Sequence, residues 1–449
     1  MKKNELAILT IEDVNNRGYG VARAEDGRVV FVANAVTGEV VEGRYIKIAK
    51  DYAVARKEKT VKESDRRVPC DCTAFPACGG CVYRHISYEY ERQLKENYVR
   101  NAFKKAGVAI TVAPCAYGEE NSYRNKIETP LTSDYKIGFY AAKSHRVIAS
   151  SDCKLQNPAL TPILDTVTAW LSEHRVTIYD ETTGKGLLRH IYLRIGERSL
   201  AVSLVLVING KALPNADDLV KTVREKHENV RSILLSHNED NTNVILGKSA
   251  TLLYGKDEIE DTLCSLSFTL SHRSFYQVNG KMAEKLYQKS AELAALTPND
   301  TLVDLFCGVG TIGLFMLKEY GAKRLIGVEI IPEAVENARR NAALNGIENA
   351  TFLCGDANQA ELENADVIVV DPPRKGCEPS LLARIAELNP KRLVYISCNP
   401  DTLARDVAIL KTHGFTTDTV YPFDLFPRTG HVESVVRLER RLDNELPMA

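Results

Sequence analysis

Hydrophobic and polar residues alternate along the first 61 residues, in short runs separated by turn residues. The runs are LAILTIEDV, GYGVARA, RVVFVAN, EVVEGRYIKIA and YAVARKEKTV, and the turns include Asn15-Asn16 and Asp26-Gly27. A period of two residues is that of a strand with one buried face. Five such strands predict a small OB-like β-barrel over residues 1–61.

The pattern becomes helical at YEYERQLKENYVRNAFKKAG, a charged amphipathic stretch that we expect to end as a helix at Gly107. Residues 123–270 mix helices and strands and contain no functional motif. Within them the apolar runs IYLRIG and SLAVSLVLV are predicted to be neighbouring strands. From about residue 272 strands and helices alternate, which predicts a parallel α/β sheet.

Composition narrows the class of protein. The 449 residues exceed one ordinary core, so two or three domains are expected. With a net charge of −1, no overall field indicates nucleic acid, but residues 44–67 hold nine Lys and Arg against four Asp and Glu. That stretch is either a solvated face or a local RNA contact. The absence of a long apolar run and of a signal-peptide core predicts a cytoplasmic protein with no membrane partner.

Four of the eleven cysteines lie together in PCDCTAFPACGGC. In a cytosolic protein such clustering indicates metal binding rather than disulfides. A zinc ion would use Cys70, Cys72, Cys78 and Cys81. An iron–sulfur cluster would use the last three with a distant ligand such as Cys153. The spacing differs from that of radical enzymes, so a structural cluster is favoured over a radical one, and the choice between zinc and iron stays open.

A glycine-rich turn follows the strand in TLVDLFCGVGTIGLFML. Gly308, Gly310 and Gly313 form G-x-G-x-x-G, and Glu329 comes 21 residues after the first of them. Glycines allow a cofactor to approach the backbone, and an acid at the next strand end can bind ribose hydroxyls. The motif suits NAD and S-adenosylmethionine equally.

Three further features favour S-adenosylmethionine. Asp304, just before the turn, suits a cationic amino-acid tail better than a pyrophosphate. Phe306 and Cys307 make the turn less uniformly small than a dinucleotide loop. The C-terminal run FTTDTVYPFDLFPRTGHVESVVRLER predicts two strands joined by a loop, and such a hairpin within a parallel sheet is typical of methyltransferases that use this cofactor.

Two other strands end in reactive groups, Asp371 in VVDPPRKG and Cys398 in ISCNPD. Ligands bind at the carboxyl ends of parallel strands, so both side chains should lie beside the glycine loop. Asn399 and Pro400 look like the start of a helix, whose dipole would favour the Cys398 thiolate. Pro372 and Pro373 stiffen the chain that follows Asp371.

These groups suit methylation at carbon 5 of a uracil. A thiolate added to carbon 6 makes carbon 5 nucleophilic toward a methyl sulfonium, and a base must then remove the carbon-5 proton. Glu433 or His431 on the terminal hairpin could be that base.

The motifs SCNPDT, FPRTGHVE, DPPRKG, SFYQVNG and DLFCGVGTIG resemble those of the RNA uracil-5-methyltransferase family. CTAFPACGGC and the later DC resemble its iron–sulfur ligands, and NNRGYGVAR resembles the start of its TRAM domain. The resemblance extends over nearly the whole chain, with the motifs in the family's order.

This resemblance implies that Cys398 is the nucleophile and Glu433, rather than His431, the base. It implies that S-adenosylmethionine is contacted by Gln277, Phe306, Gly308, Glu329, Asp356 and Asp371. It implies a [4Fe-4S] cluster on Cys72, Cys78, Cys81 and Cys153, with the role of Cys70 open.

The resemblance also implies a domain order and a substrate. Residues 1–61 would be the TRAM barrel, and residues 62–88 and 123–270 the central domain that holds the cluster. Residues 89–122 would pack a helix on the methyltransferase domain, residues 271–449. Members with both TRAM domain and cluster act mostly on 23S ribosomal RNA, so we expect this RNA rather than transfer RNA, and a monomeric enzyme.

Two other functions fit parts of the sequence. Asp-Pro-Pro resembles the motif of exocyclic-amine methyltransferases, which need no cysteine. An RNA-binding scaffold with an inert methyltransferase fold would not bind S-adenosylmethionine. A cytosine-5-methyltransferase is disfavoured because that RNA family places its nucleophile in a different motif.

Overall fold

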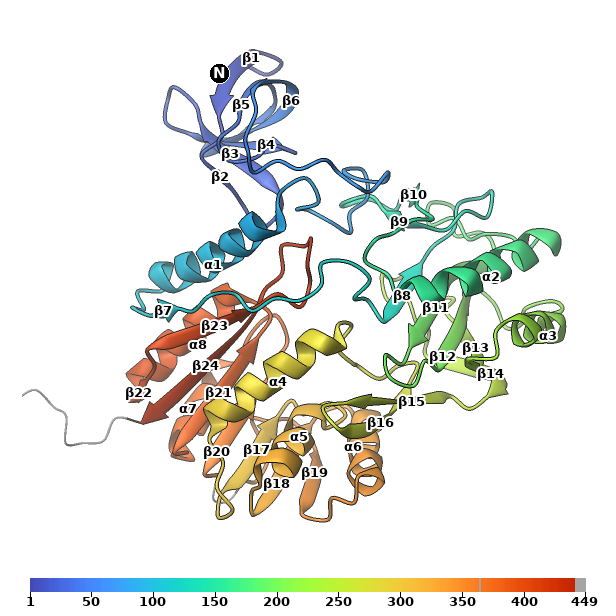
Figure 1. Ribbon diagram of the computed structural model, residues 1–449, viewed down its shortest axis with the longest axis vertical. Helices are drawn as coiled ribbons and strands as arrows, with labels where there is room; N and C mark the ends of the chain where they lie inside the picture. The colour runs from blue at the N-terminus through green and yellow to red at the C-terminus, as the bar shows by residue number, and fades with distance from the viewer. Residues whose placement is uncertain (363–364, 441–449) are drawn as a thin grey trace, which may run out of the picture.

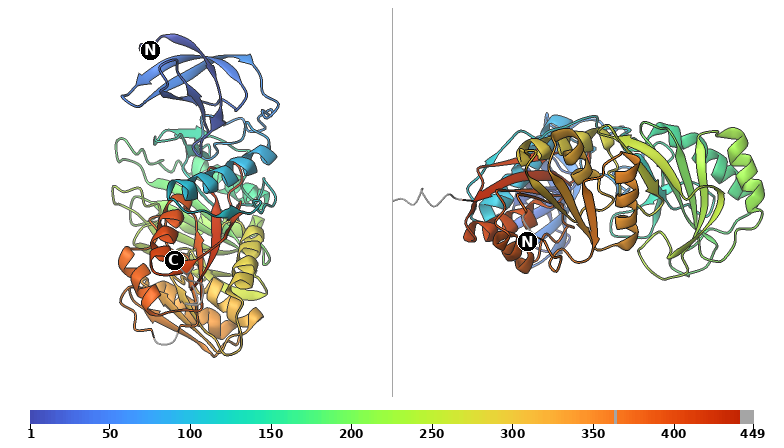
Figure 2. Two further views of the ribbon diagram at one scale, coloured as in Figure 1. Left: turned by 90° about the vertical axis from the view of Figure 1, so that its left-hand side faces the viewer. Right: turned by 90° about the horizontal axis from the view of Figure 1, so that it is seen from below.

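The computed structural model describes residues 1–362 and 365–440. A β-barrel stands at one end of the long axis, above an α/β sheet, and a second sheet lies to the side of it (Figures 1 and 2). This arrangement confirms the predicted fold, a Rossmann-like α/β domain preceded by a β-rich N-terminal domain.

The N-terminal barrel is one six-stranded sheet in the order β1-β5-β6-β4-β3-β2. Its strands are β1 (Leu6–Thr10), β2 (Asp13–Val14), β3 (Tyr19–Arg23), β4 (Val29–Ala33), β5 (Val40–Ile48) and β6 (Tyr52–Lys62). The sequence predicted a single strand over residues 6–14, which was wrong. The chain changes partner there: β1 pairs with β5 and β2 with β3.

Helix α1 (Tyr88–Lys105) forms where it was predicted. Ser87 caps its first turn by accepting a hydrogen bond from the Tyr90 amide, and Gly107 with φ +71° reverses the chain after it. Val99 and Phe103 pack into the core of the large sheet. The segment after the helix adds β7 (Thr111–Val112), which pairs in parallel with a strand of that sheet.

The central region is built on a five-stranded sheet in the order β14-β13-β12-β11-β8. Its strands are β8 (Lys126–Thr129), β11 (Leu188–Ile195), β12 (Val202–Ile208), β13 (Val230–His237) and β14 (Ser249–Gly255), and α2 (Thr161–Glu173) and α3 (Ala216–Lys226) accompany them. The predicted neighbours IYLRIG and SLAVSLVLV are β11 and β12, paired antiparallel. The short hairpin of β9 (Gly138–Tyr140) and β10 (Val147–Ala149) lies nearby, and the 3₁₀ helix η1 (Pro158–Leu160) precedes α2.

The hairpin of β15 (Glu258–Leu263) and β16 (Leu266–Ser271) leads into the large sheet, whose order is β19-β18-β17-β20-β21-β24-β23-β7. Its parallel strands are β17 (Thr301–Leu305), β18 (Arg324–Glu329), β19 (Ala350–Cys354), β20 (Val367–Val370) and β21 (Arg392–Ser397). The predicted C-terminal hairpin is β23 (Thr419–Phe423) and β24 (Glu433–Arg440), and β22 (Phe415–Thr416) also pairs with β24.

Helices cover both faces of this sheet (Figure 1). On one face the core includes side chains of α4 (Gly280–Ala294), α5 (Thr311–Tyr320) and α6 (Pro332–Leu344). On the other it includes α7 (Pro379–Glu387), α8 (Pro400–Thr412) and, from far earlier in the chain, α1. Among the described residues, no helix is both long and apolar enough to cross a membrane.

Candidate active site

The predicted cofactor and catalytic residues gather at one edge of the large sheet. β17, β18, β20 and β21 run in parallel, so the segments that follow them emerge at the same edge. These segments begin with Phe306, Ile330, Asp371 and Cys398, respectively.

The loop after β17 is organised by two carboxylates. The Gly308 amide donates a hydrogen bond to Glu329 Oε2 at 3.1 Å, and the Gly313 amide donates one to Asp304 Oδ2 at 2.9 Å. Phe306 has φ +66°, a conformation that is rare for a side-chain-bearing residue. A Cβ added at Gly308 would meet no atom within 4 Å, so the backbone there is open to a ligand.

Asp304 carries an unused acceptor at the start of this loop. Its side chain is buried, and Oδ1 has no hydrogen-bond partner among the described residues. Burial raises the pKa of this carboxyl to about 8, and the negative charges of Asp371 and Glu329 add to the effect. An ammonium group would satisfy the free oxygen and favour its ionised form, so the loop fits the amino-acid end of S-adenosylmethionine.

The remaining predicted cofactor residues lie on three other segments, and in the part of the chain that the structure describes Glu329 alone of them has a hydrogen bond to this loop. Glu329 ends β18 and also accepts the Ile331 amide at 2.9 Å. Asp356, in the turn after β19, is exposed and accepts the Asn358 amide at 2.9 Å. Gln277 is buried before α4, where Nδ2 of the Asn125 side chain donates to its backbone oxygen at 2.9 Å.

The Asp371 loop is fastened to α8. The backbone oxygen of Arg374 accepts from Asn399 Nδ2 at 3.0 Å and from the Thr402 hydroxyl at 3.3 Å. Asp406 on α8 accepts the Cys377 amide at 2.8 Å. Burial raises the pKa of Asp371 to about 7. The two prolines therefore sit in a loop that is held from both ends.

Cys398 lies directly before α8, as predicted, with Asn399 as the cap and Pro400 in the first turn. The expectation that the helix would favour the thiolate is wrong for the protein alone. Burial raises the pKa of the thiol to about 11, and the negative charges of Glu433 and Asp371 reinforce it, against the opposing charge of Arg374. Desolvation beside two carboxyl groups disfavours the charged form of the thiol.

Glu433 is brought beside Cys398 by strand register. β21 and β24 pair antiparallel with Ser397 opposite Ser434, so Cys398, which follows Ser397, lies beside Glu433, which precedes Ser434, at the end of the ladder. Glu433 is only 5% exposed. Burial raises its pKa to about 8, with Asp371 contributing, so its carboxyl changes protonation close to neutral pH.

His431, the other candidate base, faces Arg374, whose Nη2 lies 3.5 Å from its Nε2. Desolvation and the positive charge of Arg374 lower the pKa of His431 to about 4. The imidazole is therefore neutral at neutral pH.

Sequence reasoning missed the residues that hold the loop between β23 and β24. Lys95 on α1 lies 2.7 Å from Asp424 Oδ1 and 2.8 Å from Glu91 Oε1, and all three side chains are buried. A Glu and a Lys four residues apart on a helix usually form a surface pair. No pattern in the sequence distinguishes this pair from an exposed one.

The predicted metal ligands lie on neighbouring segments. Thr73 donates to Asp152 at 3.2 Å, and the Gly79 amide donates to the Tyr140 oxygen at 2.9 Å, which brings the loop of Cys72, Cys78 and Cys81 beside that of Cys153. Burial raises the pKa of the Cys78 thiol, and Cys153 and Cys72 act in the same direction.

Four thiols are a donor set for either an iron–sulfur cluster or a zinc ion. In residues 1–362 and 365–440, no three Cys, His, Asp or Glu side chains converge closely enough to bind a single metal ion.

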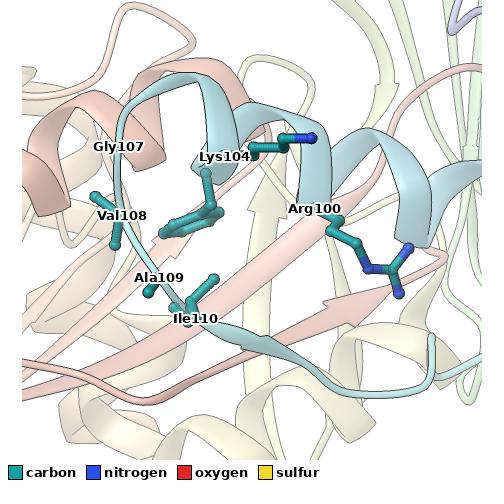
Figure 3. A pocket seen from close by; sticks show the side chains of 7 residues that line it. Arg100, Lys104, Gly107, Val108, Ala109 and Ile110 are labelled. Carbon is teal, nitrogen blue, oxygen red and sulfur yellow. The ribbon is translucent and has the colours of Figure 1, made fainter.

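A surface pocket lies away from the candidate site. It is lined by the C-terminal end of α1 and by residues 107–110, and it shares no residue with the edge of the large sheet described above (Figure 3).

Known proteins are similar in sequence to this chain over nearly its full length. An RNA methyltransferase of Halalkalibacterium halodurans, named as uncharacterized, is 39% identical, and the match covers 98% of each chain. One of Clostridium acetobutylicum, also named as uncharacterized, is 38% identical over 98% of each. The chain belongs to the RNA methyltransferase family.

A domain model and a solved structure agree with this assignment. The family model described as a methyltransferase domain matches residues 296–416. The crystal structure of Pyrococcus abyssi tRNA (uracil-54, C5)-methyltransferase in complex with S-adenosyl-L-homocysteine superimposes with a TM-score of 0.80 at 26% identity, over 96% of this chain and 99% of that one. This RNA methyltransferase therefore uses S-adenosylmethionine as its methyl donor.

The buried Glu433 carboxyl predicts an unusual dependence of stability on pH. Its pKa is about 8 in the folded protein and about 4.3 in an unfolded chain. Between these values the unfolded state has lost the proton that the folded state keeps, so the contribution of Glu433 to stability falls as pH rises and stays low above pH 8. Glu433→Gln cannot ionise and escapes this loss.

We therefore expect thermal unfolding of Glu433→Gln to occur at a higher temperature than that of the wild type. The difference should be smallest near pH 5 and reach a few degrees at about pH 8 and above. Calorimetry between pH 5 and 9 measures it, with the exposed Glu348→Gln as the control. A difference that shrinks as pH rises would contradict the raised pKa.

Proposed function

We propose that this enzyme methylates carbon 5 of a uridine in RNA, with Cys398 as nucleophile and Glu433 as general base. The observation that carries the proposal is the meeting of these two side chains at the end of the β21–β24 ladder, beside Asp371. Carbons 5 and 6 are adjacent atoms of one ring, and their chemistry needs a nucleophile and a base placed side by side.

The chain's own residues would act in a fixed order. The Cys398 thiol loses its proton to solvent and its thiolate bonds to carbon 6 of the uracil, which shifts the electrons of the carbon 5–carbon 6 double bond onto carbon 5 and makes it nucleophilic. S-adenosylmethionine supplies the methyl group. Glu433 then removes the carbon-5 proton, the electrons of that C–H bond restore the carbon 5–carbon 6 double bond, and the sulfur departs. A Glu433 pKa of about 8 suits a group that must accept a proton near neutrality.

The remaining residues at this edge of the large sheet would bind the cofactor and the uracil ring. We assign Gln277, Phe306, Gly308, Glu329, Asp356 and Asp371 to S-adenosylmethionine. The free Asp304 oxygen and the open backbone at Gly308 support this assignment. The name of the Pyrococcus abyssi structure, a uracil-C5 enzyme, supports the position of methylation. An exocyclic-amine methyltransferase would have no use for Cys398.

The order of the two steps gives a sharp prediction. Glu433→Gln keeps the size of the side chain but cannot take the carbon-5 proton, so the enzyme should stay bonded to methylated RNA. We expect a band on a denaturing gel that contains protein, RNA and the transferred methyl group. Turnover should fall at least a hundredfold, the order of a lost general base.

Cys398→Ala and the double variant should give no such band. An adduct that persists in Cys398→Ala would assign the nucleophile to another cysteine. Near-normal turnover by Glu433→Gln would assign the base to His431 or to water. Methylation by Cys398→Ala at the wild-type rate would favour the exocyclic-amine reaction.

We also propose that Cys72, Cys78, Cys81 and Cys153 hold a [4Fe-4S] cluster. The soft donor set and the adjacency of the two loops that carry it support this. Cys70, exposed two residues before Cys72, is left out of the ligand set.

Protein assembled in cells and purified without oxygen should be brown and contain about four iron atoms per chain. Iron and zinc analysis measures this. Cys153→Ser should lower the iron content sharply, whereas Cys70→Ser should leave it unchanged. Stoichiometric zinc in the anaerobic wild type would overturn the assignment.

For the substrate we propose 23S ribosomal RNA, bound in part by the TRAM-like barrel. The combination of barrel and cysteine motif supports this choice, and the basic residues of segment 44–67 would contact phosphates. The Pyrococcus abyssi enzyme is named for transfer RNA, so the two substrates must be compared directly.

In a strain that lacks the gene, 5-methyluridine should disappear from 23S ribosomal RNA and persist in transfer RNA. Mass spectrometry of the separated RNAs measures both, and a plasmid copy of the wild-type gene, but not of Cys398→Ala, should restore the modification. If 5-methyluridine is lost from transfer RNA alone, the substrate is transfer RNA and the proposal of 23S ribosomal RNA is wrong.

A further inference from the structure

The loop between β23 and β24 is held by a buried ionic cluster formed with α1. Lys95 Nζ contacts Glu91 Oε1 at 2.8 Å, Asp424 Oδ1 at 2.7 Å and the backbone oxygen of Phe426 at 3.2 Å. Glu91 Oε1 also accepts the Arg428 amide at 2.7 Å. The side chains of Lys95, Glu91 and Asp424 are at most 1% exposed.

This cluster contacts the hairpin of β23 and β24 at the end that carries Glu433. Phe423 and Glu433 form the last pair of the β23–β24 ladder, and Asp424 is the next residue along the chain. Lys95 therefore fixes the point where β23 stops and the loop to Glu433 begins. Without it, two ties between α1 and this loop would be lost at once, those to Asp424 and to the Phe426 oxygen.

Segments that precede α1 also contact the same loop. Arg428 has φ +69° and donates from Nη1 to the Ile86 oxygen at 2.9 Å, and its own backbone oxygen accepts the Val82 amide at 2.9 Å. A Cβ at Gly430 would lie 1.6 Å from the Asn16 oxygen of the barrel. The loop is thus enclosed by earlier segments. Lys95 pairs with two buried carboxylates there, Glu91 and Asp424, and the Arg428 guanidinium also lies 3.6 Å from Glu91 Oε2.

We propose that Lys95 is a positioning residue for the release step, holding the β23–β24 hairpin so that Glu433 faces carbon 5 of the Cys398-bound uridine. This inference rests on the proposed function. Cys398 is held separately, by β21 and by the Asn399 cap of α8. Loss of Lys95 should therefore disturb proton removal more than formation of the sulfur–carbon bond.

The chemistry makes these two effects distinguishable. When Glu433 is misplaced, the carbon-5 proton stays, the double bond cannot re-form, and the sulfur remains bonded to carbon 6. The enzyme then accumulates as methylated adduct. A variant that is only less stable would lose adduct formation and turnover in the same proportion.

The test uses Lys95→Met in the full-length enzyme, with RNA and methyl-labelled S-adenosylmethionine. We expect kcat to fall tenfold to a hundredfold, the order of effect of a small misplacement of a reacting group. The fraction of enzyme trapped as adduct should rise severalfold over the wild type. Asp424→Asn keeps a side-chain oxygen but removes its charge, so it should show a smaller effect in the same direction. If Lys95→Met does not fold, the result with Asp424→Asn decides the test.

Lys391→Met is the control for losing a lysine that bridges two carboxylates, although Lys391 is 61% exposed and Lys95 only 1%. Lys391 also bridges two carboxylates, Asp300 at 3.1 Å and Asp366 at 2.9 Å, but at the opposite edge of the same sheet. It should lower thermal stability without trapping adduct.

The proposal is overturned if folded Lys95→Met and Asp424→Asn trap no more adduct than wild type, or if Lys391→Met traps as much. Failure of the proposed function itself looks different, because Glu433→Gln would then trap no adduct either.

Discussion

The antiparallel pairing of β24 with β21 is the constraint on which the active site depends. Cys398 follows a parallel strand and Glu433 begins an antiparallel one, so only this pairing brings them together. A slip of one residue would turn the Glu433 side chain to the other face of the sheet.

The active site concentrates carboxyl groups that the fold keeps from water. Asp304, Asp371 and Glu433 all have raised pKa values, with burial as the first cause. Such groups cost stability when they ionise, so the site is a strained part of the protein. The same burial raises the pKa of the Cys398 thiol to about 11.

Support for this strained edge comes from parts of the chain outside the methyltransferase domain. Helix α1 occupies a helix position on the large sheet, although the whole central region separates it in sequence from that sheet. Its Lys95 neutralises buried carboxylates, and breaking a buried pair of this kind costs about 3–5 kcal/mol. This buried cluster is therefore one of the contacts that couple the N-terminal segments to the large sheet.

The sequence by itself determined the elements whose signals are local: the β-rich N-terminus, α1 with its Gly107 stop, the alternating α/β pattern, the glycine loop and the terminal hairpin. It also placed Asp371 and Cys398 at one edge, because parallel strands share their carboxyl ends. Tertiary structure alone decided the split of β1 from β2, the meeting of Cys398 with Glu433, the raised pKa of that cysteine and the burial of Lys95. Each of these depends on partners distant in sequence. Local periodicity carries no information about which strands pair or which charged side chains are buried.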